Sequence, residues 1–389
     1  MRTCIKRKQL LYTILLIFTL LLAGCWDTNE PERMVYIHGL GVDYNKGRYT
    51  IYLQIINTGL LAKSESGGGE NQAKVEVGKA SGKNINEAIF NLYRSSQRKI
   101  FWGHLGYVVF TESALKEGAI RSTIDLLNRY RETRYRMWMY ATKEPLFELL
   151  STSPIMELST ALSRLSDPYS TYQQSSFIQP VDMRELLILL DEPPYQAIIP
   201  YMKLTEDNWT KDGQVRKAIK TEGIAAVTSD KLLAVMTEKK VNGLKWLNND
   251  LVREEVKLIK EGYEDINMLI DKLNVEVKPF SRKGKVYFSI SIEADAVLRE
   301  MPEKKSIKEI AKVLEQTMEK QVREAYLAGL KNNTDIYRLS ESLYRKDVQL
   351  WKSIEQKGKI PLTKDSLQQI DINATIINGA KQRKEPTLY

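Results

Sequence analysis

The residue with the clearest chemistry in this chain is Cys25, which ends the short motif Leu22, Ala23, Gly24, Cys25. An aliphatic residue three positions before a cysteine, with two small residues between them, is the pattern of a bacterial lipobox. In such a motif the cysteine thiol is acylated and the chain is cleaved immediately before the cysteine. The motif therefore predicts a lipid attachment site at Cys25 and a mature chain that begins there.

The residues before this motif have the order of a signal peptide. Four basic residues lie within the first eight positions, and 10–22 is an apolar run of 13 residues. A membrane-spanning helix needs about 20 apolar residues, so this run is short for one and fits a signal peptide. We therefore expect a lipoprotein signal peptide at 1–24 and two acyl chains on Cys25, enough for a firm anchor. An ordinary secretory signal with an incidental cysteine, or an uncleaved anchor, fits the spacing less well.

Few other residues have the types and spacing that catalysis needs. Cys4 and Cys25 are the only cysteines, and Cys4 would leave with the signal peptide, so no disulfide or free thiol is expected. His38 and His104, the only histidines, are flanked by glycine and apolar residues. This setting favours hydrogen-bonded structural histidines over a metal site or a general base. We predict no catalytic residue, no cofactor and no metal.

Three further motifs have structural interpretations. Gly39 and Gly41 form a Gly-x-Gly without the third glycine and helix of a dinucleotide site, so we expect a bulge or close packing. The adjacent carboxylates 191–192 and 254–255 are expected on the solvated surface. A basic cluster at the end of an expected helix favours structural pairing, with partner or lipid contact as the alternative; it comprises Arg129, Arg131, Arg134 and Arg136 with Tyr130 and Tyr135.

The composition is that of a globular protein, with 28% charged and 43% hydrophobic residues among 389. The net charge of +9 falls to +5 in the mature chain, because the signal peptide carries four basic residues and no acid. This small surplus is compatible with an anionic lipid surface, and we expect no nucleic acid partner. The mature length exceeds what one core usually holds, so two or three domains are predicted.

Hydrophobic patterns predict a multi-domain α+β fold with mixed and antiparallel sheets and packed helices. The N-terminal region, 25–202, is expected as one unit or two subdomains, because its Pro-rich stretch 151–200 permits only short helices. A polar linker is predicted at 203–217, followed by a C-terminal α+β domain at 218–389. Its clearest elements are a strand at 286–294, a helix opened by the capping box Ser306 to Glu309, and a final strand at 370–376.

The residues after the lipobox carry a family resemblance. Cys25 with Trp26, Asp27 and Glu30, and then the strand ending Gly39 to Asp43, resemble the start of the Ger(x)C proteins. Shorter pieces resemble that family in the same order along the chain: Gly103 to Leu105, Glu132 to Arg134, Gly223 to Ala225, Asp230 to Leu232, Gly243 to Leu247 and Asp335 to Trp351. The Ger(x)C proteins are the lipoprotein C subunits of spore germinant receptors in endospore-forming bacteria.

The resemblance implies a non-enzymatic subunit, anchored by lipid on the extracytoplasmic side of the spore inner membrane. It implies two partners: a partly soluble, multi-spanning A subunit and a membrane-embedded, transporter-like B subunit. It also implies mixed α/β domains in an unusual fold, and Cys25 is the only functional site that it transfers.

Three functions follow from these features. The first is a lipid-tethered interaction subunit that helps assemble a germinant receptor. The alternative is an extracytoplasmic solute-binding lipoprotein that senses a nutrient directly, which requires a cleft between two lobes with converging polar groups. A hydrolase acting on cortex peptidoglycan has the least support, because histidines are scarce and no catalytic motif occurs.

Overall fold

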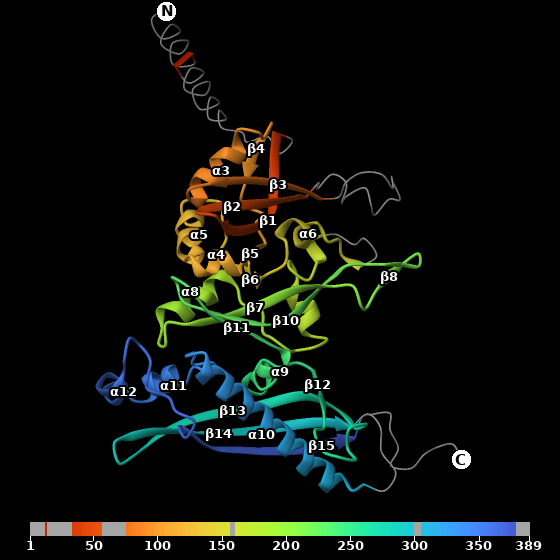
Figure 1. The fold of residues 1–389 in the computed structure, drawn as a ribbon, viewed down its shortest axis with the longest axis vertical. Helices are drawn as coiled ribbons and strands as arrows, with labels where there is room; N and C mark the ends of the chain where they lie inside the picture. The colour runs from red at the N-terminus through yellow and green to blue at the C-terminus, as the bar shows by residue number, and fades with distance from the viewer. Residues whose placement is uncertain (1–11, 14–32, 57–74, 156–159, 299–304, 379–389) are drawn as a thin grey trace, which may run out of the picture.

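The structure is a computed structural model, and it describes residues 12–13, 33–56, 75–155, 160–298 and 305–378. The predicted lipid site Cys25 and nearly all of the predicted signal peptide lie outside these residues. Figure 1 shows an elongated molecule, in which a first sheet with its helices lies above a second sheet. No helix in the described ranges has both the length and the apolar character that crossing a bilayer requires.

The first sheet takes up the chain from β1 to β11. Within the described residues it has nine strands in the order β11-β10-β7-β6-β5-β1-β2-β3, with β4 beside β1. The central strands β1, β5, β6 and β7 are parallel, and antiparallel hairpins extend the sheet at both edges. The strands are β1 Met34–Asn45, β2 Arg48–Ile56, β3 Val75–Gly82, β4 Lys99–Phe101, β5 Tyr107–Thr111, β6 Trp138–Thr142, β7 Ala197–Thr205, β10 Ala218–Val227 and β11 Leu232–Thr237.

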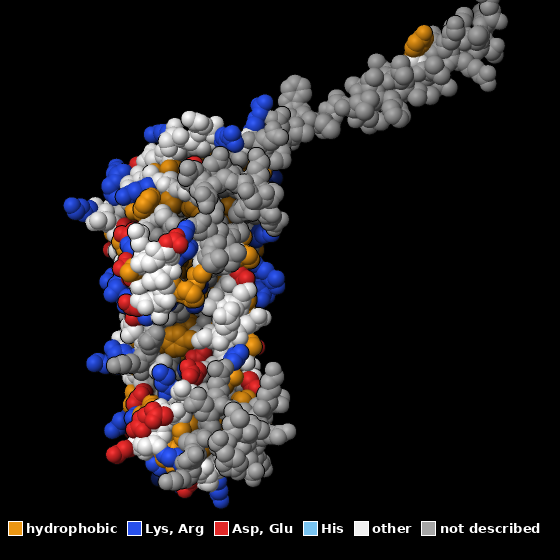
Figure 2. Space-filling model, turned by 90° about the vertical axis from the view of Figure 1, so that its right-hand side faces the viewer, with side chains coloured by type: hydrophobic (Ala, Val, Ile, Leu, Met, Phe, Trp, Pro, Cys, Tyr) orange, Lys and Arg blue, Asp and Glu red, His pale blue; other side chains and the backbone are white. Residues whose placement is uncertain are grey.

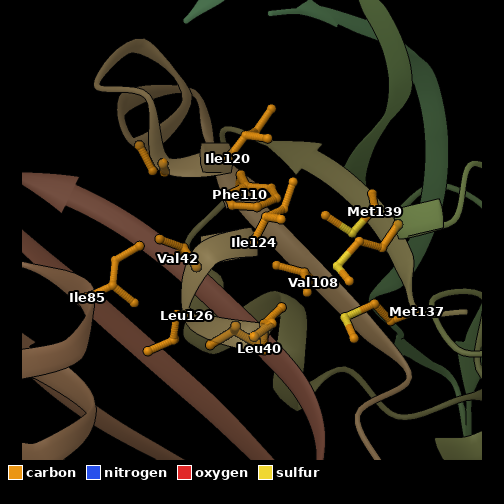
Figure 3. Close-up of a cluster of buried hydrophobic side chains, with 14 of the residues drawn as sticks. Leu40, Val42, Ile85, Val108, Phe110, Ile120, Ile124, Leu126, Met137 and Met139 are labelled. Atoms are coloured by element: carbon orange, nitrogen blue, oxygen red, sulfur yellow. The ribbon is translucent and has the colours of Figure 1, made fainter. Parts of the chain in front are cut away.

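Helices cover both faces of this sheet. Along β5, Val108 and Phe110 point to one face and Tyr107 and Val109 to the other, as the two-residue period of a strand requires. The first face packs against α3 (Ile85–Tyr93), α4 (Glu112–Lys116), α5 (Ala119–Leu127) and α8 (Met183–Asp191) in the largest core (Figure 3). The second face packs against α6 (Leu146–Ser151) and Leu165, which precedes α7 (Pro168–Tyr172).

The second sheet has four strands in the described residues, in the order β12-β13-β14-β15. They are β12 (Glu254–Lys257), β13 (Asn267–Arg282), β14 (Lys285–Leu298) and β15 (Leu367–Asn378). The last two strands are parallel, so the chain between them crosses over through α10 (Ile307–Lys331), α11 (Leu339–Lys346) and α12 (Val348–Ile354). Helix α10 lies across the sheet (Figure 1) and buries Leu314, Met318 and Val322 against it. The predicted α+β fold with mixed sheets is confirmed.

The first sheet continues across the predicted linker 203–217. Strand β7 extends to Thr205, and β10 pairs with it antiparallel from Ala218 opposite Thr205 to Val227 opposite Ala197. The polar residues between them form a small hairpin, β8 (Thr210–Lys211) with β9 (Gln214–Val215). The chain passes to the second sheet only after β11, through α9 (Glu238–Val241) and the 3-10 helix η5 (Leu244–Leu247).

Candidate functional site

The beginning of β1 is the described strand end that follows Cys25 most closely along the chain. Strand β1 starts at Met34, nine positions after Cys25, and β4 lies beside it with Lys99 opposite Met34. Nine residues span at most about 30 Å, whatever their conformation. A lipid on Cys25 would therefore hold this end of the first sheet close to the membrane.

The predicted arginine cluster lies at the same end of the sheet. Only Arg129 has the predicted structural partner, because it pairs with Asp125 at 2.9 Å on the last turns of α5. Arg131, Arg134 and Arg136 are exposed and form no ion pair in the described part of the chain. Figure 2 shows Lys and Arg side chains (blue) around this end of the molecule. The loop thus leaves three cations exposed at the end of the first sheet where β1 begins.

His38 lies on β1 in a partly buried position. Its Nε2 atom is 2.6 Å from the Ser166 hydroxyl, and its ring meets the Tyr107 ring edge-on at 5.6 Å. Burial lowers the pKa of His38 to about 4, outweighing hydrogen bonds that raise it, so the neutral ring is held at neutral pH. A hydrogen-bonded structural histidine, as the sequence predicts, fits this setting.

Gly39 and Gly41 lie on the face of β1 opposite to the largest core. A Cβ on Gly39 would fall 2.4 Å from the Tyr107 ring, and one on Gly41 would fall 3.1 Å from Leu146 of α6. The β1–β2 register shifts between Ile37 and Gly39, which is a bulge or irregularity. Of the predicted alternatives, a bulge or close packing, the close packing is confirmed, and both glycines face the packed interior.

His104 is exposed near the beginning of β1. Its ring contacts the Tyr36 ring edge-on at 5.0 Å and lies 6.2 Å from the Phe101 ring. No group of three or more His, Cys, Asp or Glu side chains with metal-binding geometry occurs in the described ranges. His104 therefore belongs to an aromatic cluster beside β4.

The two predicted carboxylate pairs differ in their surroundings. Asp191 and Glu255 are exposed as predicted, and Glu192 forms an ion pair with Arg345 at 2.7 Å that lowers the pKa of Glu192. For Glu254 the prediction of a solvated position is wrong: it is 7% exposed and pairs with Lys245 at 2.9 Å. The fold buries Glu254 because β12 brings it under η5, a contact between segments that no local pattern indicates.

The two halves of the molecule share a core and a polar junction. Ile224 and Met236 of the first sheet pack with Ile336, which follows α10. Beside them, the Arg338 guanidinium donates to the carbonyls of Gln196 at 2.5 Å and Pro193 at 3.1 Å, in the loop before β7. Arg338 also pairs with Glu341, three residues along the chain. Sequence reasoning missed its role at the junction, because the partners there are backbone atoms far away along the chain.

This architecture is similar to one solved structure. The crystal structure of the GerBC protein superimposes with a TM-score of 0.51 and 16% sequence identity, over 87% of this chain and 97% of that one. At this low sequence identity, the structural similarity shows a shared fold and nothing further. Two family models also match: the spore germination protein N-terminal domain over residues 27–204, and the spore germination B3/GerAC-like C-terminal domain over 222–379.

The fold and the two matched domains define a two-part α+β spore germination protein. The chain belongs to the Ger(x)C family of spore germination proteins. Spore germination protein KC of Bacillus subtilis (strain 168) is 24% identical over 371 residues, which cover 90% of each chain. Spore germination protein YndF of the same organism is 20% identical over 409 residues, covering 97% of this chain and 98% of YndF.

Proposed function

We propose that this chain is the lipid-anchored C subunit of a nutrient germinant receptor. In this role it is a non-enzymatic subunit that helps to assemble the receptor on the extracytoplasmic side of the spore inner membrane. Its partners are the A and B subunits of the same receptor, which are membrane proteins, and the membrane itself through the lipid. It takes no cofactor and does not bind nucleic acid.

The observation that carries the proposal is the position of Cys25 relative to the family match. The N-terminal family domain begins at residue 27, two positions after the lipobox cysteine. The lipobox therefore stands directly at the start of the germination protein domains. The short connection from Cys25 to Met34 supports a receptor subunit whose first sheet is held near the membrane.

Tethering explains how a subunit without catalytic groups contributes to germination. A lipid on Cys25 confines the ectodomain to one membrane face, where the A and B subunits also lie. Partner docking then becomes nearly intramolecular, with an effective concentration on the order of millimolar for a short tether. Weak surface contacts are sufficient for assembly under this condition.

The test is a pair of cysteine variants produced in sporulating cells. Cys25→Ala removes the acylated thiol, so we expect loss of the protein from the spore membrane fraction and slower nutrient-triggered germination. Cys4→Ala changes the other cysteine, within the predicted signal peptide, and is expected to leave both unchanged. Membrane retention and normal germination of the Cys25→Ala spores would overturn the proposal.

A further inference from the structure

A cavity of about 440 Å³ lies between the first sheet and the segment that leads into the second. One wall comes from β6, β7 and β10, and the opposite wall from the chain between α9 and β12. The α7 region closes a third side. Its polar lining includes Tyr140, Arg164, Tyr172, Lys220, Lys245 and Glu254. A volume between about 300 and 1,000 Å³ is usual for small-molecule sites.

Arg164 is the lining residue whose charge has no protein partner in the described part of the chain. Its side chain is partly buried, and its guanidinium forms no ion pair or hydrogen bond within the described part of the chain. Burial lowers the pKa of Arg164, because removal from water disfavours the charged form, and nearby Tyr140 opposes this effect only in part. An arginine remains charged in proteins, so an unpaired one in a cavity favours the entry of an anion.

The one acid of the described cavity lining is already engaged by other groups. Glu254 is the only acid among the described lining residues, and its two oxygens accept from Lys245 and from the Ser175 hydroxyl, each at 2.9 Å. Lys220 pairs with Glu222 at 3.0 Å. With Lys245 paired to Glu254 and Lys220 paired to Glu222, Arg164 is the one cation of the described lining without an ion pair.

The remaining lining suits a small organic molecule. Thr171, Thr221 and Asn242 offer neutral hydrogen-bonding groups, and Phe177, Ile178 and Met202 supply an apolar wall. A single unpaired guanidinium matches one carboxylate, which it can bind through two parallel hydrogen bonds. A phosphate dianion would demand more uncompensated charge than one arginine provides.

We propose that this cavity binds a small organic carboxylate, with the Arg164 guanidinium pairing with the carboxylate and the Phe177 side of the cavity holding its apolar part. This site goes beyond the proposed assembly role and does not depend on it, because binding needs neither the A and B subunits nor the lipid.

The test uses the full mature protein purified in detergent, with isothermal titration calorimetry. The probes are propionate, lactate, L-alanine and L-leucine, each compared with its primary amide, which has the same shape without the negative charge. We expect at least one acid to bind with a dissociation constant of about 1 mM or below, and its amide to bind at least tenfold more weakly. Inorganic phosphate is titrated as a competing anion.

Two variants assign the binding to Arg164. Arg164→Gln should weaken the binding of the acid at least tenfold and leave thermal unfolding of the free protein unchanged or higher, because an unpaired buried charge is removed. Arg121→Gln, an exposed arginine that pairs with Asp230, serves as the matched control and should bind as the unaltered protein does. The proposal would be overturned by the absence of binding heat with all four acids up to about 10 mM. It would also be overturned by unchanged affinity in Arg164→Gln, or by phosphate binding more tightly than the acids.

Discussion

At the scale of single residues, His38 shows how the burial of one side chain makes the stability of the fold depend on pH. The pKa of His38 is lowered to about 4 in the folded chain, against 6.5 for an unperturbed histidine. The unfolded chain therefore binds a proton at His38 between these values and the folded chain does not. The stability that His38 contributes is complete above pH 6.5 and is lost as the pH falls towards 4.

The corresponding prediction concerns the variant His38→Gln, which cannot gain this proton. The free energy of unfolding of the unaltered protein, relative to His38→Gln, should fall by about 2 kcal/mol between pH 7 and pH 5. Urea unfolding at several pH values measures this difference. The exposed, non-titrating Gln174 provides the control, and Gln174→Ala should follow the unaltered protein over the same pH range. Parallel curves for His38→Gln would contradict the assignment of the buried neutral ring.

Single residues also show how far sequence reasoning extends. The glycines 39 and 41 were predictable as packing positions, because the Gly-x-Gly lacked the rest of a nucleotide motif. Arg164, Glu254 and Arg338 were not predictable, because the property that matters in each is burial beside a segment distant in sequence. The basic cluster was predicted in part, since only Arg129 has a partner within the same helix.

At the scale of elements, local signals predicted where helices and strands begin. The capping box at the start of α10 is present: the Ser306 hydroxyl accepts from the Glu309 amide, and the Glu309 carboxylate accepts from the Ser306 amide. The long strand β13 was not predicted, although Val275 and Val277 alternate with exposed residues as in a half-buried strand. It pairs with β14 from Met268 to Arg282 and with β12 from Asn267 to Ile270, partners that its own sequence does not indicate.

The capping box gives a prediction at this scale. Ser306→Ala leaves the Glu309 amide at the exposed start of α10 without its partner and should lower the free energy of unfolding by about 1 kcal/mol. Ser306→Asp retains an acceptor and adds a negative charge near the positive end of the helix dipole, so it should stay within about 0.5 kcal/mol of the unaltered protein. Denaturant unfolding of both variants measures the difference. An equal loss in the two variants would show that the acceptor does not matter.

At the scale of the whole molecule, Arg338 holds the two halves together. Its guanidinium satisfies carbonyls of the loop before β7, whereas the neighbouring Arg345 pairs with Glu192 at an exposed site. We expect Arg338→Met to lower the free energy of unfolding by about 2–4 kcal/mol, because buried carbonyls lose their donors. The matched change Arg345→Met should cost less than about 1 kcal/mol. Chemical denaturation compares them, and similar losses would contradict this view of the junction.

The sequence predicted the fold class of the whole molecule, but it did not predict which strands pair with one another. Alternating apolar patterns indicated two α+β halves, and the family models also divide the chain between residues 204 and 222. The polar residues between 204 and 222 include the β8–β9 hairpin, which connects β7 to β10 of the first sheet. Hydrogen bonds between β7 and β10 cross this division, and composition carries no signal for such pairing.

The continuity of the first sheet has a practical consequence for exchanging parts between related proteins. A hybrid joined between residues 204 and 222 would make β7 from one parent pair with β10 from another along the whole length of β10. A fragment ending there would expose the edge of β7, and open sheet edges invite aggregation. Hybrids joined after Thr237, where β11 ends, keep every strand of the first sheet from a single parent. Recombination experiments on this family should therefore place the crossover at α9.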